Sequence, residues 1–286
     1  MTRLQGTRKI ALMCQYLGVT RQAYYKRLHK QLRDGLNQEL VKVMIQEIRQ
    51  HMPRIGGRKL HYLLNRRFKD QSMHSIGRDK LFALLREEGM LVLKKRKYTK
   101  TTYSKHWMRT YPNLAALMRL DAPEQLWVAD ITYVALAQGY LYLHLITDAY
   151  SKKIMGYVLS PELSANISLR ALKMALANRY YSHQLTHHSD RGLQYCSGLY
   201  TDYLRNHHVQ ISMTEHGDPY ENAIAERVNG ILKDEFGLGD TLESFTQANK
   251  LVHDSIQIYN HQRPHWSCGL LTPCERHLQK TKKPPK

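Results

Sequence analysis

Apolar residues recur along this chain with two different periods, and the change between them comes near residue 120. From residue 38 to residue 93 the apolar positions follow helical spacing, as at Leu40, Val43 and Met44. From residue 124 onward, short runs rich in β-branched and aromatic residues replace this spacing, which is typical of strands. The pattern therefore predicts a helical segment followed by an α/β domain.

The helical segment is predicted to hold three helices, with breaks at Gly56-Gly57 and Gly89. These helices cover residues 40–48, 58–64 and 77–88. The α/β domain is predicted to contain three strands, then helix, strand, helix, strand and two long helices. These elements cover residues 125–136, 139–148, 153–159, 166–180, 185–188, 198–207, 209–213, 216–235 and 242–259.

The helix predicted over residues 216–235 has a marked start. Asp218 is a suitable N-cap, Pro219 suits the first helical position, and Glu221 completes a capping box. A buried stripe at helical spacing is expected at Ile224, Val228 and Ile231.

The same helix presents a second face with a carboxylate and a lysine. Glu226 lies about 200° round the helix from Ile224, away from the stripe. Lys233 follows two turns later on the side of Glu226. On an arbitrary helix such a face is a solvated surface, so its meaning depends on the rest of the chain.

Residues 7–30 contain two helical patches joined by Gly18-Val19-Thr20. A short glycine turn between two helices fits a helix-turn-helix, in which Thr20 caps the second helix. An ordinary helical hairpin explains the pattern equally well. Residues 1–37 are therefore predicted as an N-terminal helical segment that is either of these.

Charge divides the chain at the same place as the apolar pattern. The formal net charge is +19; residues 1–119 hold 27 Lys and Arg against 7 Asp and Glu, whereas residues 120–286 hold 16 against 17. A basic segment of this kind favours a polyanionic partner through counterion release. No amphipathic helix with a clean basic face stands out, so nucleic acid is expected as the partner and a membrane is not.

A basic and aromatic stretch, residues 94–123, links the two segments. Such a stretch can follow a DNA backbone and stack on exposed bases. A disordered tether explains the same composition, and order can also arrive on binding. The candidate DNA contacts in it are Lys94, Lys95, Arg96, Lys97 and Trp107.

The sequence also bears on compartment and thiol chemistry. No stretch approaches 18 consecutive apolar residues and the start lacks a signal-peptide core, so a cytoplasmic protein is expected. The cysteines form no C-x-x-C pair; reduced thiols and no structural zinc are predicted. Residues 279–286 are expected to be a disordered tail.

Three acidic residues stand apart in the α/β domain. Asp130 interrupts an apolar strand, where an unpartnered carboxylate is costly. Asp190 follows the short strand at 185–188, and Glu226 lies on the long helix. Between Asp130 and Asp190 lie 59 residues, between Asp190 and Glu226 lie 35, and Lys233 comes seven residues after Glu226.

This spacing resembles the DDE signature of the retroviral integrase superfamily, and the chain is similar to the second-frame (OrfB-type) transposases of the insertion sequence three family. The resemblance implies a ribonuclease H-like catalytic core over residues 124–278, a five-stranded mixed sheet with flanking helices. It also implies a helix-turn-helix DNA-binding domain over residues 38–93. The residues that carry the resemblance are Trp127–Thr132, His188–Tyr195, Glu221–Glu226, Leu232–Glu235 and Tyr259–His265.

The resemblance also suggests which residues meet DNA. Basic residues near the third helix of the helix-turn-helix are more often phosphate contacts than base readers, so binding is predicted and specificity is not. Arg263 is a further candidate, although packing of the C-terminal tail against the core explains it at least as well. The remaining candidates are Arg58, Arg78 and Lys80 in the helix-turn-helix, and Lys233 and Asn222 near the catalytic residues.

By resemblance, Asp130, Asp190 and Glu226 are the catalytic residues and hold two magnesium ions, with Asp130 bridging them. Two ions in such a site can activate the attacking oxygen, stabilise the leaving oxygen and neutralise the phosphate. Oxygen ligands suit magnesium, and manganese is expected to substitute. Asp148, at the end of a predicted strand, is expected to be a turn residue and not a ligand.

The resulting prediction is a DNA transposase that cleaves and joins DNA at the ends of an insertion sequence. The resemblance implies a homo-oligomer on element ends and target DNA, a smaller upstream-frame partner or fusion, and a place at the bacterial nucleoid. An alternative is a catalytically silent DNA-binding regulator, or a subunit active only when fused to the upstream product. A nuclease acting on RNA–DNA hybrids shares the fold but leaves the basic N-terminal half unexplained.

Overall fold

The computed structural model describes residues 10–93, 109–215 and 222–279, leaving aside the side chains of residues 31–36. The chain divides into two compact units. The helical unit comprises Met1–Gln50 and Gly56–Leu91, and the sheet unit comprises His51–Ile55 and Val92–Lys286. In the described ranges every helix is too short or too polar to serve as a membrane span. The cysteines, which are buried free thiols, are Cys14, Cys196, Cys268 and Cys274.

The helical unit contains α2 (Arg21–His51), α3 (Gly57–Asp70) and α4 (Arg78–Glu87). A helix over residues 10–16 precedes α2, and Thr20 Oγ1 accepts a hydrogen bond from the Ala23 backbone N at 3.1 Å. The cap predicted at Thr20 is therefore confirmed. Helix α2 continues past residue 37, where the sequence predicted a boundary between the N-terminal segment and the next domain. Gly35 does not end the helix, because a single glycine costs only about 1 kcal/mol in a helix.

Apolar side chains from α2, α3 and α4 form the core of the helical unit. Asn65 of α3 binds the segment that leads to α4: its Nδ2 donates to the Ile76 carbonyl at 3.1 Å, and its Oδ1 accepts from Ile76 N at 2.8 Å. A Cβ on Gly57 would lie 2.8 Å from the Phe82 ring, so a larger residue there would displace that ring. The core residues are Ile45, Ile48, Leu60, Leu64, Leu81 and Leu85.

The sheet unit is built on five strands in the order β3-β2-β1-β4-β5. The first three strands are antiparallel neighbours, whereas β4 and β5 run parallel to β1. The strands are β1 (Leu126–Leu136), β2 (Gly139–Asp148), β3 (Ile154–Ser160), β4 (Thr186–Ser189) and β5 (Gln210–Met213). Each strand end lies within one residue of its predicted position. The predicted fold class, a five-stranded mixed sheet with flanking helices after an all-α region, is confirmed.

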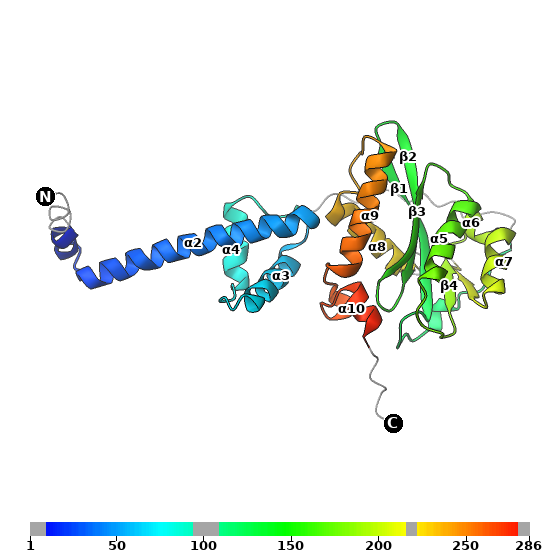
Figure 1. Ribbon diagram of the computed structural model, residues 1–286, viewed down its shortest axis with the longest axis horizontal. Helices are drawn as coiled ribbons and strands as arrows, with labels where there is room; N and C mark the ends of the chain where they lie inside the picture. The colour runs from blue at the N-terminus through cyan, green and yellow to red at the C-terminus, as the bar shows by residue number, and fades with distance from the viewer. Residues whose placement is uncertain (1–9, 94–108, 216–221, 280–286) are drawn as a thin grey trace, which may run out of the picture. The chain divides into compact units, whose positions relative to one another are not determined.

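Helices cover both faces of the sheet (Figure 1). The helices of this unit are α5 (Ala165–Ala177), α6 (Leu193–Cys196), α7 (Gly198–Asn206), α8 (Ala223–Phe236), α9 (Phe245–His261) and α10 (Pro273–Leu278), with 3-10 turns at Ala115–Leu117 and Trp266–Cys268. Successive strand residues point to opposite faces. Trp127 and Ala129 of β1 join an apolar cluster with α5 and α7. Leu126 and Val128 face the other way and pack with Ala225 of α8.

Two helices begin later than predicted. Helix α8 starts at Ala223 with Asn222 at its N-cap, four residues after the expected start at position 219. The predicted capping box at positions 218 and 221 lies outside the described residues. Helix α9 starts at Phe245, not residue 242, because Ser244 Oγ accepts from the Gln247 backbone N at 3.2 Å and caps it there.

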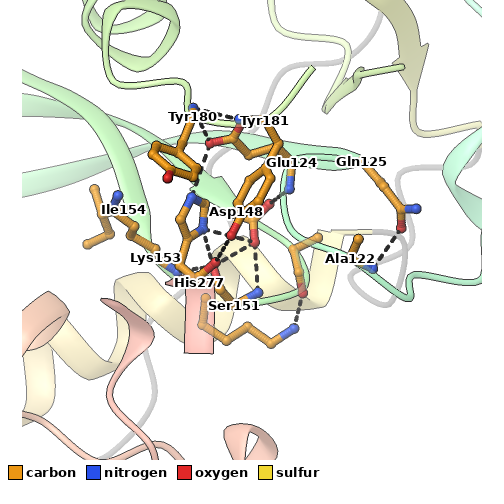
Figure 2. A network of polar contacts seen from close by, with 12 residues as sticks. Ala122, Glu124, Gln125, Asp148, Ser151, Lys153, Ile154, Tyr180, Tyr181 and His277 are labelled. Carbon is orange, nitrogen blue, oxygen red and sulfur yellow. Dashed lines mark hydrogen bonds and ion pairs between the residues drawn. The ribbon is translucent and has the colours of Figure 1, made fainter. Parts of the chain in front are cut away.

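A buried polar network fastens α10 to the sheet (Figure 2). His277 Nε2 lies 3.1 Å from Glu124 Oε1, and its Nδ1 lies 3.8 Å from Asp148 Oδ1. Asp148 also accepts hydrogen bonds from Ser151 N and Ser151 Oγ at 2.7 and 2.6 Å. Asp148 thus shapes the turn after β2, the role that the sequence favoured for it.

Candidate active site

Asp130 lies in the middle of β1, on the face that packs against α8. It follows Leu126 and Val128 at every second position and therefore shares their side of the sheet. Asp130 is half-buried. Asn229 of α8 donates from Nδ2 to Asp130 Oδ2 at 2.6 Å. This carboxylate is thus held at the contact between β1 and α8.

Asp190 comes directly after β4, next to Asp130 in the sheet. Strands β1 and β4 are parallel, and Val128 lies opposite His188. Two residues further along each strand, the same register brings Asp190 beside Asp130 on the same face. Asp190 Oδ1 accepts a hydrogen bond from Gly192 N at 3.0 Å, which orders the turn leading away from the strand.

Glu226 lies in the first turn of α8 and is exposed. Two side chains of α8 tie this part of the helix to β1. Asn222 Nδ2 donates to the Ala129 carbonyl at 3.2 Å, and Asn229 binds Asp130 as described. Glu226 lies between these two anchors along the helix, about 60° round the axis from Asn229. The helix therefore presents Glu226 beside the two strand carboxylates.

Burial and like charges raise the pKa of Asp130 to about 7. Burial is the largest cause, the negative charge of Asp190 is the next, and the charge of Glu226 adds to them. Hydrogen bonds from the Ile131 backbone and from Asn229 act in the opposite direction. Two carboxylates within electrostatic reach of Asp130 favour a cation bound beside it.

The chemistry of these donors fits a hard divalent metal ion. Carboxylate oxygens are the ligands that magnesium and manganese prefer, and a cation would offset the repulsion at Asp130. Within the described residues, no three His, Cys, Asp or Glu side chains are arranged closely enough to enclose a metal ion. The three carboxylates thus lie near one another but do not yet surround a single metal position.

Lys233 and Asn222, the two predicted DNA contacts on α8, differ in their surroundings. Lys233 is half-buried; burial lowers its pKa, and the charges of Asp130 and Asp234 raise it, so it lies within electrostatic reach of the carboxylates. Asn222 is buried and its amide donates within the chain. DNA contacts by Lys233 and by Asn222 both stay predictions.

Arg263 is buried, contrary to its predicted contact with DNA. Its side chain is 1% exposed, and its Nε and Nη2 each donate to an oxygen of Glu235 at 2.7 Å. The alternative, in which the C-terminal tail packs against the core, is the one observed. A buried guanidinium needs such a partner because an unpaired buried charge is costly.

The other predicted DNA contacts belong to the helical unit or fall outside the described residues. Arg58, Arg78 and Lys80 are exposed, and Arg78 Nε lies 2.9 Å from Asp79 Oδ1. All of these contacts stay predictions. The candidates outside the described residues are Lys94, Lys95, Arg96, Lys97 and Trp107.

Asn229 is a site residue that the sequence did not reveal. It lies one turn after Glu226, between the buried residues Val228 and Leu232 of α8. A polar residue within a buried stripe needs a hydrogen-bond partner, which was the available signal. The partner, Asp130, is determined by the packing of α8 against β1, which the sequence pattern does not specify.

Comparison with known proteins points to one family. The sequence matches an integrase core domain family over residues 121–219 and a second integrase core domain family over residues 207–273. It is 33% identical over 266 residues to the insertion element IS600 uncharacterized 31 kDa protein of Shigella sonnei, covering 91% of this chain and 96% of that protein. It is 30% identical over 275 residues to transposase InsF for insertion sequence IS3A of Escherichia coli (strain K12), covering 94% of each.

Solved structures show a more distant likeness. The HTLV-2 integrase catalytic core domain in complex with magnesium is 17% identical, with a TM-score of 0.45 over 55% of this chain and 97% of that one. The simian T-cell lymphotropic virus intasome in complex with PP2A regulatory subunit B56 gamma is 16% identical, with a TM-score of 0.49 over 84% of this chain and 76% of that one. At these identities the likeness concerns the fold alone.

Proposed function

Because this chain belongs to the family of IS3 insertion-sequence transposases and carries an integrase core domain, we propose that Asp130, Asp190 and Glu226 are its catalytic carboxylates. With them the transposase would cleave DNA at the ends of its insertion sequence and transfer the strands to a target. The observation that carries this proposal is the meeting of three carboxylates from separate elements, two of which raise the pKa of the third.

The same three residues are the candidate ligands of two magnesium ions, for which manganese can substitute. Bound there, the ions would supply an activated oxygen nucleophile and a stabilised leaving oxygen. The charges of both other carboxylates raise the pKa of Asp130. Asp130 is therefore the candidate ligand of both ions, and Asp190 and Glu226 are candidate ligands of one ion each. Asn229 donates a hydrogen bond to Oδ2 of Asp130 and so orients that carboxylate.

The remaining polar groups of the site are suited to binding DNA. Lys233 lies two turns along α8 from Glu226 and brings a positive charge close to the carboxylates. It is the candidate contact for the phosphate next to the reacting bond. Arg58 and Lys80 of the helical unit are exposed cations and candidate contacts to the phosphates of the element end.

The family and the reaction define the expected setting. A transposase acts on two element ends and a target, so assembly of several copies on double-stranded DNA is expected, in the cytoplasm where a bacterial chromosome lies. The resemblance to the family also leads us to propose an upstream-frame product, either as a separate partner or fused to this chain. It would explain a chain that binds DNA but needs help to cut it.

The test incubates the purified full-length chain with labelled DNA carrying an element end, in the presence of magnesium, calcium or EDTA. A nicked or joined product is expected with magnesium only, and Glu226→Gln is expected to remove it, by roughly 10⁴-fold, while DNA binding is retained. Glu162→Gln, an exposed carboxylate of the sheet unit outside the site, is the matched control and keeps full activity.

Two other outcomes would contradict the proposal in different ways. A Glu226→Gln protein with undiminished product would remove this residue from the catalytic set. Binding without product in any metal would favour the silent regulator, unless the chain fused to an upstream product recovered magnesium-dependent cleavage.

A further inference from the structure

A buried ion pair joins the last turn of α8, the helix that carries Glu226, to the segment that follows α9. Arg263 donates from Nε and Nη2 to the two oxygens of Glu235, at 2.7 Å each. Arg263 is 1% exposed and Glu235 is 13% exposed. Two parallel hydrogen bonds between planar groups fix direction as well as distance. The pair therefore sets the orientation of the C-terminal end of α8.

The guanidinium is mounted on a part of the fold that is tied to the sheet independently of α8. The Arg263 guanidinium carbon lies 5.7 Å from the centre of the Tyr259 ring. The Tyr259 hydroxyl donates to the Lys152 carbonyl at 2.9 Å, in the turn before β3. Tyr259 is fully buried. Arg263 thus fixes Glu235 relative to this segment of the sheet unit.

Other hydrogen bonds hold both ends of α8. In its last turn, the Glu235 carbonyl accepts a hydrogen bond from the Arg54 backbone N at 3.1 Å. At its N-terminal end, Asn222 donates to the Ala129 carbonyl. After the helix, Leu242 N donates to the Ala135 carbonyl at 2.9 Å, and Ala137 N donates to the Leu242 carbonyl at 2.8 Å. To these hydrogen bonds the Arg263 pair adds a charged side-chain contact at the last turn of α8.

We propose that Arg263 is a positioning residue for strand cleavage and transfer: through Glu235 it holds α8 in the rotation and axial position at which Glu226 meets Asp130. This inference rests on the proposed function of Glu226. Glu226 and Glu235 are nine residues apart on one helix, about 13 Å, so a shift at one end moves the other. A misplacement of about 1 Å at a reacting centre can cost roughly 100-fold in rate.

A pair that merely stabilised the fold would behave differently. Replacing a buried ion pair by apolar residues of similar size is often neutral for stability. Apolar residues do not, however, fix a direction as two hydrogen bonds do. The double variant Glu235→Leu/Arg263→Met therefore separates positioning from stability.

The experiment uses the full-length chain below its melting temperature, with two readouts. Mn²⁺ affinity is measured by electron paramagnetic resonance, and the rate of magnesium-dependent cleavage is measured on element-end DNA. The folded double variant is expected to lose roughly 10–100-fold in each. Arg263→Lys, which keeps the charge but lacks the planar fork, is expected to fall between it and the wild type. Wild-type Mn²⁺ affinity and rate in the folded double variant would overturn the proposal.

His277→Gln is the matched control, because it also removes a buried polar contact of the sheet unit but does not touch α8. Its melting temperature is expected to fall, with Mn²⁺ affinity and cleavage rate unchanged. Should the double variant fail to fold, Arg263→Lys and Glu235→Gln are measured against the same control.

The two readouts also separate this inference from the proposed function. Weaker Mn²⁺ binding in the variant, together with a wild type that cleaves no DNA, would support positioning and count against the transposase chemistry. A wild type that cleaves DNA, with equal Mn²⁺ affinity and rate in the variant, would sink the positioning role alone.

Discussion

An uncharged amide binds the central carboxylate of the candidate active site. Asn229 is 6% exposed, and its Nδ2 donates to Asp130 Oδ2 at 2.6 Å. Since an amide does not titrate near neutral pH, this hydrogen bond orients Asp130 without adding a charge. Groups that orient metal ligands in this way typically contribute one to two orders of magnitude to metal affinity or activity.

We therefore expect Asn229→Ala to lower magnesium-dependent cleavage by roughly 10–100-fold with little change in DNA binding. The removed amide leaves Asp130 free to turn away from the site. Asn206→Ala, at an exposed position at the end of α7, is the control. Equal single-turnover rates for wild type and Asn229→Ala on a labelled element end would contradict this role.

The carboxylates could be found from the sequence, but their supports could not. Asp130, Asp190 and Glu226 stand in recognisable local patterns at a recognisable spacing. The bond between Asn229 and Asp130 joins residues 99 positions apart, and the pair of Arg263 and Glu235 joins residues 28 apart. Such partners are defined by helix packing, which no local pattern encodes. The sequence accordingly left Arg263 open between a DNA contact and packing of the C-terminal tail against the core.

At the scale of elements, α5 lies against β3 with no room for a side chain at Gly156. A Cβ there would lie 2.2 Å from the Ala171 carbonyl oxygen and 2.7 Å from Ala175 N, both in the backbone of α5. A helix backbone cannot yield as a flexible side chain can. Gly156 therefore sets the distance between this helix and the sheet.

Gly156→Ala is expected to destabilise the chain by about 3 kcal/mol, at the upper end for overpacking, because the whole of α5 must move. Gly230→Ala in α8 is the matched substitution: its Cβ would meet nothing within 4 Å. It is expected to stabilise the chain by about 1 kcal/mol through helix propensity. Urea denaturation of both variants measures the two effects, and equal midpoints would refute the packing argument.

The attachment of α10 introduces a dependence on pH. Burial lowers the pKa of His277, but hydrogen bonds with Asp148 and Glu124 outweigh it, so the pKa lies above its ordinary value of 6.5. Lys153 also acts on His277 and lowers its pKa, and the Tyr181 hydroxyl donates to the His277 carbonyl. A histidine whose pKa is raised by folding stabilises the chain most below 6.5, and this contribution is lost as the pH rises through the folded pKa.

Thermal melting of wild type and His277→Gln at about pH 6 and about pH 9 tests this. The wild type is expected to exceed the variant by several degrees at the lower pH, and by clearly less at the higher pH, where His277 is neutral. A difference that stayed constant, or grew with pH, would show that His277 is not charged between its two carboxylates.

The strands could be placed closely from sequence, whereas helix starts could not. Runs of β-branched and aromatic residues between turns located every strand to within one residue. The Ser244 side chain caps α9, whereas Asn222, at the N-cap position of α8, makes no side-chain capping hydrogen bond and binds β1 instead. A side-chain cap contributes about 1 kcal/mol, so tertiary contacts such as that of Asn222 with β1 can decide where a helix starts.

At the scale of the whole molecule, the basic charge and the proposed catalytic carboxylates lie in different parts of the chain. The basic excess lies in residues 1–119, and residues 120–286 carry slightly more acidic than basic residues. The carboxylates therefore stand in a part of the chain with little electrostatic attraction for DNA. Affinity for DNA is expected to come mainly from the N-terminal part, and its salt dependence reports the phosphates engaged there.

Arg58→Gln and Lys80→Gln are each expected to weaken binding to any DNA sequence and to lower the slope of log K against log salt by about 1. Lys250→Gln, on the exposed surface of α9, is the control and leaves the slope unchanged. Fluorescence anisotropy over a series of salt concentrations gives the slopes. An unaltered slope in both variants would place DNA elsewhere on the chain.

The order of elements along the chain has a consequence for synthesis. The basic helices are translated first, while the last carboxylate lies on α8 and the arginine that orients that helix comes later still. A chain released by the ribosome before α8 keeps the basic segment but lacks the third carboxylate. If the roles proposed above hold, premature termination is expected to yield a chain that binds element ends without cutting them, so that unfinished copies would restrain the finished enzyme.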